Sequence, residues 1–250
     1  MLEFSTIEWA IVILCALLIG FSKTGIPGTG ILMVPLMAMV MPAKQSTGFV
    51  LPMLAMADIM AIIYWRRHVE ARHLIRLLPW AWLGVIIGAV CLRYISNAQL
   101  KPTIGAIVLV LIIGSWIRER LVDDAQIPTH WFFAALMGVL AGSTSMMANA
   151  AGPVMILYLM AMRLAKREFI GTGAWFFWIL NLSKLPFSSK LDLINGPSLV
   201  TNLSLLPVLL LGGILGIFLV QRVPQKAFDF IVKFLAMASA LYLCVSRLSP

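Results

Sequence analysis

Residues 23–30 read KTGIPGTG, a run of glycine, proline and threonine between two apolar stretches, 7–22 and 30–41. The second half of the chain has a similar interruption, with GSTS at 142–145 and NAAGP at 149–153. Proline removes a backbone donor and glycine costs helix stability, so neither run favours a regular helix. The sequence therefore predicts two helix breaks, each beside apolar stretches that are too short to cross a membrane alone.

The two breaks occupy matching positions because the chain repeats itself with an offset of 123 residues. The tetrapeptide LMAM at 36–39 recurs at 159–162, and Asp58 falls on Asn181. The other matches, with an offset of 128 for the last two, are Lys44 with Arg167, Gly48 with Gly171, Gly84 with Gly212, and Gly88 with Gly216. We interpret this pattern as an internal repeat in a single domain, 1–250, with copies at about 7–120 and 129–247.

The composition is that of a membrane protein. Hydrophobic residues make up 61% of the chain, charged residues only 12%, and the mean hydropathy is +0.98. The apolar stretches lie at about 7–22, 30–41, 46–65, 74–95, 102–117, 131–142, 150–162, 169–188, 198–221 and 227–246. Because a crossing helix needs about 20 apolar residues, the chain has room for about eight to ten membrane segments and none for a large extramembrane domain.

The distribution of charge predicts the orientation of these segments. Five segments in each copy is an odd number, so the second copy must enter the membrane inverted relative to the first. Loops on one side carry eleven Lys and Arg residues and loops on the other side carry five. The positive-inside rule then places both termini outside the cytoplasmic membrane, and the excess of basic residues predicts orientation, not nucleic-acid binding. The expected fold is an all-α integral membrane protein of two inverted repeats, whose broken or re-entrant helices meet near the midplane.

The two breaks are the expected binding site. Irregular backbone at membrane depth must be buried in protein or line a watery cavity, and paired interruptions in inverted halves mark the midplane site of many transporters. Free amides at the start of a half-helix favour an anion. The expected substrate-binding residues at the breaks are Lys23, Thr24, Gly25, Gly28, Thr29, Gly30, Ser143, Thr144, Ser145, Asn149 and Gly152. The alternative is that these small residues only allow close helix packing.

Three ionisable residues lie within or beside apolar segments, where a charge is costly. Asp58 is thirteen residues into the stretch 46–65, and we expect it to bind a coupling ion or proton; the alternative is a protonated structural strut. Lys23 is either the fixed charge that attracts an anion or an interfacial anchor. Lys184 lies one turn after Asn181, and both are candidate substrate ligands, although Lys184 can instead snorkel to the membrane surface.

Other chemistry is not expected. The GSTS run has no histidine base within reach in the sequence, so we expect no serine hydrolase and no catalytic residue. The chain carries no phosphate-binding glycine loop. Cys15, Cys91 and Cys244 lie in separate apolar runs and form neither a metal-ligand pattern nor a disulfide framework. We therefore predict a protein that is not an enzyme, with no cofactor and no metal.

Several motifs resemble the TauE/SafE sulfite exporter family, also called TSUP or domain of unknown function 81. They are FSKTGIPGTG at 21–30, VPL at 34–36, PAKQS at 42–46, LP at 51–52, and Asp58. The resemblance covers nearly the whole chain and implies an inner-membrane transporter of a sulfur-containing anion such as sulfite or a sulfonate.

The leading hypothesis is alternating-access secondary transport of that anion, coupled to protons or another cation. A passive anion channel and a membrane accessory protein are the alternatives. The expected partners are the anion, the lipid bilayer and the coupling cation, and a homo-oligomer is left open.

Overall fold

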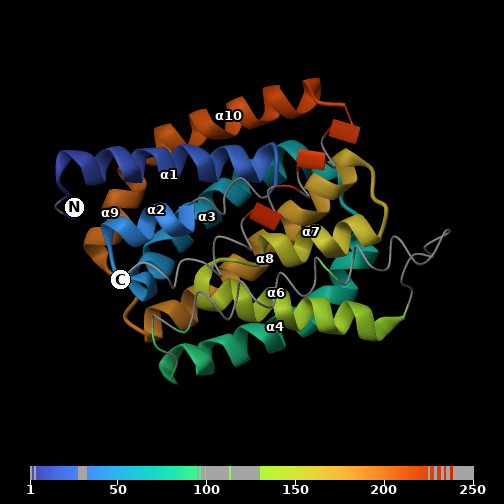
Figure 1. Ribbon diagram of the computed structural model, residues 1–250, viewed down its shortest axis with the longest axis horizontal. Helices are drawn as coiled ribbons and strands as arrows, with labels where there is room; N and C mark the ends of the chain where they lie inside the picture. The colour runs from blue at the N-terminus through green and yellow to red at the C-terminus, as the bar shows by residue number, and fades with distance from the viewer. Residues whose placement is uncertain are drawn as a thin grey trace.

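The computed structural model describes residues 4–27, 33–94 and 130–224, together with Leu2 and single positions at 96, 99, 113 and between 226 and 238. All regular elements in these ranges are helical (Figure 1). The first half contains α1 (Thr6–Thr24), α2 (Met33–Val40), α3 (Ala43–Trp65), a short 3-10 helix (Arg66–His68) and α4 (Ala71–Tyr94). The second half contains α6 (Trp131–Ala148), α7 (Gly152–Ala161), α8 (Lys166–Lys190), α9 (Gly196–Ser204) and α10 (Leu206–Arg222).

Both predicted breaks exist, but each begins later than expected. The helix α1 includes Lys23 and Thr24 and ends at Gly25, and α6 runs through GSTS at 142–145 to end at Asn149. The prediction that helix stops at GSTS is therefore wrong. The hydroxyls of Ser143 and Thr144 donate to backbone carbonyl oxygens one turn back in α6, which satisfies them without interrupting the helix.

The predicted single helix at 198–221 is also wrong, because this stretch forms α9 and α10, which meet at an angle of 49°. Pro207 is in the first turn of α10 and has no backbone N–H to continue the hydrogen bonding of α9. Leu205, between the two helices, has a helical backbone, so the chain bends without leaving the helical region. The bend therefore has a cause that is visible in the sequence.

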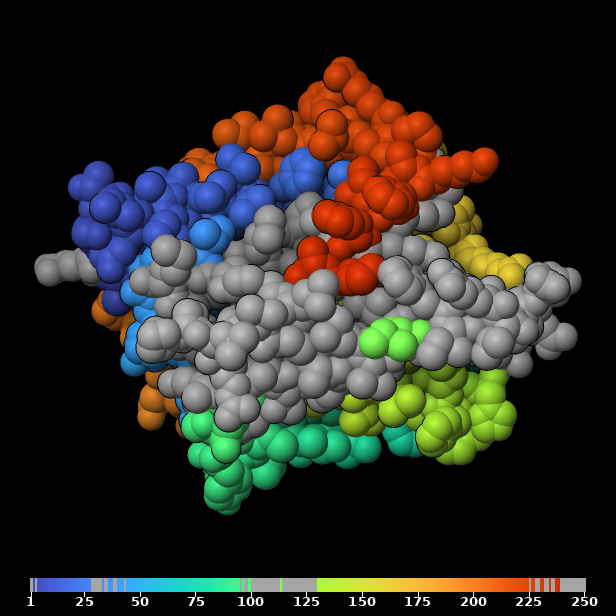
Figure 2. Space-filling view, viewed as in Figure 1, coloured from blue at the N-terminus to red at the C-terminus, as the bar shows by residue number. Residues whose placement is uncertain are grey.

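The helices of the second half follow those of the first in the same order. By the offset of 123 residues α6, α7 and α8 correspond to α1, α2 and α3, and α9 with α10 corresponds to α4. Helices of the first half pack mainly against helices of the second half: α1 packs along α10, α4 packs along α6, and α3 packs against α8. Figure 2 shows α1 and α10 along one edge of the molecule and α4 and α6 along the opposite edge.

Glycines at matching positions make the two outer helix crossings close. Gly84 of α4 lies against the Val139 carbonyl group of α6, and Gly212 of α10 lies against the Leu17 carbonyl group of α1. A Cβ atom at any of these crossings would overlap backbone atoms of the partner helix. Small residues that let backbones approach are the usual device of helix packing in membranes.

Four described helices, α1, α3, α4 and α6, are long and apolar enough to cross a membrane, and the bent pair of α9 and α10 is a fifth if it is one span. The predicted segment 102–117 lies outside the described residues except for position 113, and most of the segment 227–246 lies outside them too. Large apolar side chains point outward from α4 and α10, among them Ile86, Val90, Leu211, Leu215 and Phe218. The protein is therefore an all-α integral membrane protein with several membrane-spanning helices.

Candidate functional site

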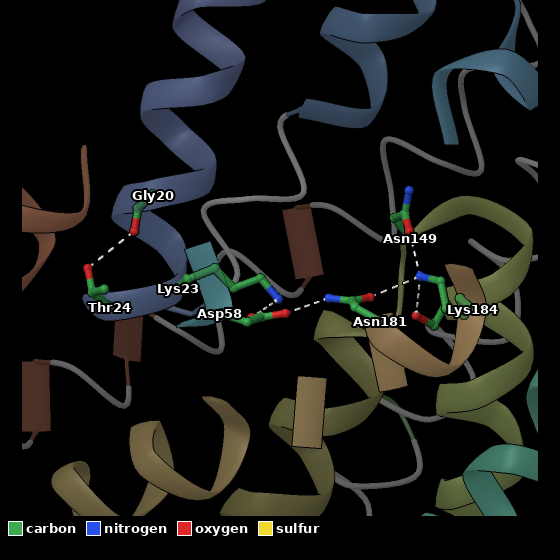
Figure 3. Close-up of polar contacts among 8 residues, drawn as sticks. Gly20, Lys23, Thr24, Asp58, Asn149, Asn181 and Lys184 are labelled. Atoms are coloured by element: carbon green, nitrogen blue, oxygen red, sulfur yellow. Dashed lines mark hydrogen bonds and ion pairs between the residues drawn. The ribbon is translucent and has the colours of Figure 1, made fainter. Parts of the chain in front are cut away.

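A row of mostly buried polar side chains joins α1 and α3 of the first half to α6 and α8 of the second half (Figure 3). The Nζ atom of Lys23, at the end of α1, lies 2.8 Å from Oδ1 of Asp58 on α3. The Asp58 side chain is fully buried, and its Oδ2 accepts a hydrogen bond of 2.6 Å from Nδ2 of Asn181 on α8. A buried carboxylate needs such partners, because an isolated charge in an apolar interior is very costly.

Lys184, one turn further along α8, continues the row. Its Nζ donates to Oγ of Ser145 at 2.9 Å, to Oδ1 of Asn149 at 2.7 Å and to Oδ1 of Asn181 at 3.1 Å. Three acceptors match the three N–H donors of an ammonium group. The side chain is only 2% exposed, so the alternative that Lys184 snorkels to the membrane surface is wrong.

Asn149 positions the Lys184 end of the row through its backbone conformation and two hydrogen bonds. It ends α6 in the left-handed conformation, with φ at 53°, which asparagine tolerates better than most residues. Its Nδ2 donates to the Thr47 carbonyl oxygen of α3 at 3.0 Å, and its Oδ1 accepts from Lys184. The second break is therefore tied to both α3 and α8.

The ionisable groups of this row do not balance. The row contains two lysines and one aspartate, and all three acceptors of Lys184 are neutral. With the three groups ionised, one positive charge has no counter-ion within the row. Buried charges without compensation are rare and usually mark function.

Lys23 links this charged row to a cavity. Its side chain is 12% exposed, and Nζ also lies 4.1 Å from the centre of the Phe177 ring, within the range of a cation–π contact. Both residues line a cavity that encloses about 830 Å³ of empty space, part of it open to solvent. Ser22, Ser145, Asn149 and Asn181 are the other polar side chains of its wall. Lys23 is therefore the charged side chain among the described residues of the cavity wall.

The structure brings only some of the expected site residues together. Six of them form the row, namely Lys23, Asp58, Ser145, Asn149, Asn181 and Lys184. Gly152 also lines the cavity, at the start of α7. Gly28, Thr29 and Gly30 lie outside the described residues.

The remaining expected residues make packing contacts. The Thr24 hydroxyl donates to the Gly213 carbonyl oxygen of α10 at 2.6 Å, and a Cβ atom on Gly25 would lie 2.7 Å from Gly216 Cα. Ser143 and Thr144 bond to their own helix, and neither is among the residues that line the cavity.

Most of the cavity residues were not among the sequence-based candidates, although for Ser22 and Phe177 the repeat carries a signal. Ser22 and Ser145 are 123 residues apart, and both line the cavity. Phe177 corresponds in the same way to Leu54, which also lines it. Residues that the offset of 123 pairs therefore line one common cavity.

The fold and the site define a class: a multi-pass α-helical membrane protein with a buried ionic network beside a cavity between its two halves. The chain belongs to the TauE/SafE sulfite exporter family, whose model, described as "Sulfite exporter TauE/SafE", matches residues 12–243. This match confirms the resemblance seen in the sequence and makes the protein a member of a membrane transporter family. No curated protein and no solved structure gave a significant match to the chain.

Proposed function

We propose that the protein is a secondary transporter that moves a small sulfur-containing anion across the membrane by alternating access. The observation that carries this proposal is the ionic network at the end of α1: two lysines and one aspartate lie in one hydrogen-bonded row, and Lys23 borders the cavity. A fixed positive charge in a low-dielectric environment attracts an anion far more strongly than a surface charge does. The family description supports sulfite or a related sulfur anion as the substrate.

Lys23 is the group through which substrate and coupling ion interact in this proposal. Its ammonium group is bonded to Asp58 and is also accessible from the cavity. An anion bound to Lys23 weakens the bond to Asp58, and a buried carboxylate that loses its cation must be neutralised by a proton or another cation. Anion and cation binding are then linked, as coupled transport requires.

The arrangement of the halves supports the alternating-access part of the proposal. The predicted repeat makes α1 equivalent to α6 and α10 equivalent to α4, so the α1–α10 pair corresponds to the α6–α4 pair, and each pair joins one half to the other. The polar row also connects the halves, because it runs from α1 and α3 to α6 and α8. Rocking of two inverted repeats around a central site is the usual mechanism of such folds.

We place the protein in the cytoplasmic membrane with both termini outside, and assign it no enzymatic activity.

Transport by purified protein in liposomes tests the proposal. Sulfite, thiosulfate and short sulfonates are offered with and without an imposed proton or sodium gradient. We expect saturable flux that responds to a gradient in the wild type and loses that response in Asp58→Asn. Flux that does not saturate and ignores every gradient would identify an anion channel instead. Folded protein that moves none of these anions would contradict transport and favour the role of an accessory protein.

A further inference from the structure

Three arginines flank the point where the ends of α3 and α10 meet, on the side of the molecule where α8 begins (Figure 1). Gln221 of α10 donates a hydrogen bond to the Tyr64 hydroxyl of α3, which holds the two helix ends together. Arg66 and Arg67 follow Tyr64 closely, and Arg222 follows Gln221 directly. All three arginines are exposed, and none forms an ion pair with a residue that the structure describes. The joined helix ends therefore present three positive charges without acidic partners.

The surrounding helix ends add to this positive charge. Lys166, at the start of α8, donates to the carbonyl oxygens of Val220 and Val223 at 2.9 and 2.7 Å, so α8 begins beside the end of α10. Within 62–78, 160–170 and 218–224 there are eight Lys and Arg residues but only two acidic ones, Glu70 and Glu168. The described helix ends on the opposite side are nearly balanced, with Lys44, Arg93 and Lys190 against Glu8 and Asp192. The excess of positive charge is therefore confined to one side.

Exposed apolar side chains continue from the three arginines along both helices. Ile63 lies just before the end of α3 and is 68% exposed, and Ile59 lies one turn further back and is also exposed. On α10, Phe218 is 59% exposed and lies three residues before Gln221, which places both on one face of the helix. Because α3 and α10 both lie in segments of membrane-spanning composition, these side chains face hydrocarbon while the arginines lie at the level of the lipid headgroups.

This combination matches the chemistry of an anionic phospholipid. A guanidinium group binds the two anionic oxygens of a phosphodiester in a bidentate manner, with good geometry. In a phospholipid the phosphate lies at the membrane surface and the acyl chains extend into the hydrocarbon, along a path that the exposed side chains of α3 and α10 provide. A soluble phosphate compound would use the arginines only and gain nothing from the apolar surface.

We propose that the joined ends of α3 and α10 bind one anionic phospholipid, with Arg66, Arg67 and Arg222 at its phosphate and its acyl chains along Ile63 and Phe218. None of these five residues is among those that line the cavity, so this lipid site is separate from the anion site. The bound lipid contacts one helix from each half of the chain. It therefore stabilises the contact between the halves at this end of the molecule.

Lipid titration of the purified protein tests this inference. Dioleoylphosphatidylglycerol and dioleoylphosphatidylcholine share their acyl chains and differ in net charge, and each is added to protein in a non-ionic detergent at low salt. Native mass spectrometry measures the Kd of the first bound lipid. We expect the wild type to bind phosphatidylglycerol at least tenfold more tightly than phosphatidylcholine, with a contribution of roughly fivefold from each arginine near the phosphate.

Two triple variants show whether the location of the charges matters. Arg66→Gln/Arg67→Gln/Arg222→Gln is expected to bind the two lipids with nearly equal affinity. Lys44→Gln/Arg93→Gln/Lys190→Gln is the matched control, because it removes the same number of charges from the opposite helix ends, and it should keep the preference of the wild type. If the first variant does not fold, the single variant Arg222→Gln, with an expected loss of roughly fivefold, replaces it.

The outcomes are decisive in both directions. Equal affinity of the wild type for the two lipids would overturn the proposal. An equal loss of preference in the two triple variants would also overturn it, because the effect would then follow from net charge alone. Glycerol 3-phosphate, which has the phosphate but no acyl chains, should not displace bound phosphatidylglycerol at equal concentration. Displacement would identify a phosphate site and contradict a lipid site.

Discussion

Replacing Asp58 by asparagine should strengthen anion binding while it removes coupling. The carboxylate lies 2.8 Å from Lys23 Nζ. An anion that contacts Nζ from the cavity would have its charge centre about 6 Å from that of the carboxylate, a repulsion of roughly 3 kcal/mol at an effective dielectric constant near 20. Because reorganisation of Lys23 takes part of this energy, we expect Kd to fall by about ten- to a hundredfold.

The assay is calorimetric titration of butanesulfonate into wild type and Asp58→Asn in nanodiscs at low salt. Asp192→Asn is the control, since it removes the same charge from an exposed position at the end of α8 where φ is 54° and asparagine is well tolerated. This control should bind as the wild type does. Weaker binding in a folded Asp58→Asn variant would refute the reasoning, because Asp58 would then support the substrate instead of competing with it.

Two further predictions concern packing and the buried ammonium group. Gly142→Ala would push Cβ into the Ala81 carbonyl group of α4 and should lower the free energy of unfolding by about 3 kcal/mol, whereas Gly173→Ala, with its nearest described atom at 3.7 Å, should change the melting temperature little. An equal loss of stability in Gly142→Ala and Gly173→Ala would contradict the close approach of α4 and α6 at Gly142. Lys184→Met leaves three acceptors, on Ser145, Asn149 and Asn181, without their donor, so the melting temperature should fall, and loss of the positive charge should weaken anion binding. A large loss of stability with binding intact would make Lys184 structural.

Much of the fold follows from the sequence because its signals are local or repeated. Glycine and proline locate both breaks, and the offset of 123 residues predicts that α6 to α8 repeat α1 to α3. The predicted break at GSTS was wrong, although serine and threonine lower helix propensity on average. Their hydroxyl groups can donate hydrogen bonds to carbonyl oxygens of the same helix, which propensity alone does not reveal. Pro207 was a usable signal for the bend between α9 and α10.

The site was less predictable because contacts between helices depend on their rotation and depth. Asp58 was expected inside the protein and is fully buried, but the sequence left Lys23 and Lys184 between a site role and the membrane surface. It did not show that the two lysines lie at two ends of one row. The predicted repeat contained part of this information, because Asp58 and Asn181, which the offset of 123 residues pairs, are joined by a hydrogen bond. No comparable rule pairs Lys184 with Asn149, since that contact depends on how α6 ends.

In the proposed mechanism the positive charge of Lys23 beside the cavity binds the substrate anion, and the Kd of butanesulfonate for Lys23→Ala tests this most directly. Loss of Lys23 leaves one lysine and one aspartate in the row, so we predict a Kd at least tenfold weaker than in the wild type. Lys23→Arg, which keeps the charge, should retain part of the affinity. Equal Kd values for the wild type and a folded Lys23→Ala variant would contradict a role of Lys23 in anion binding.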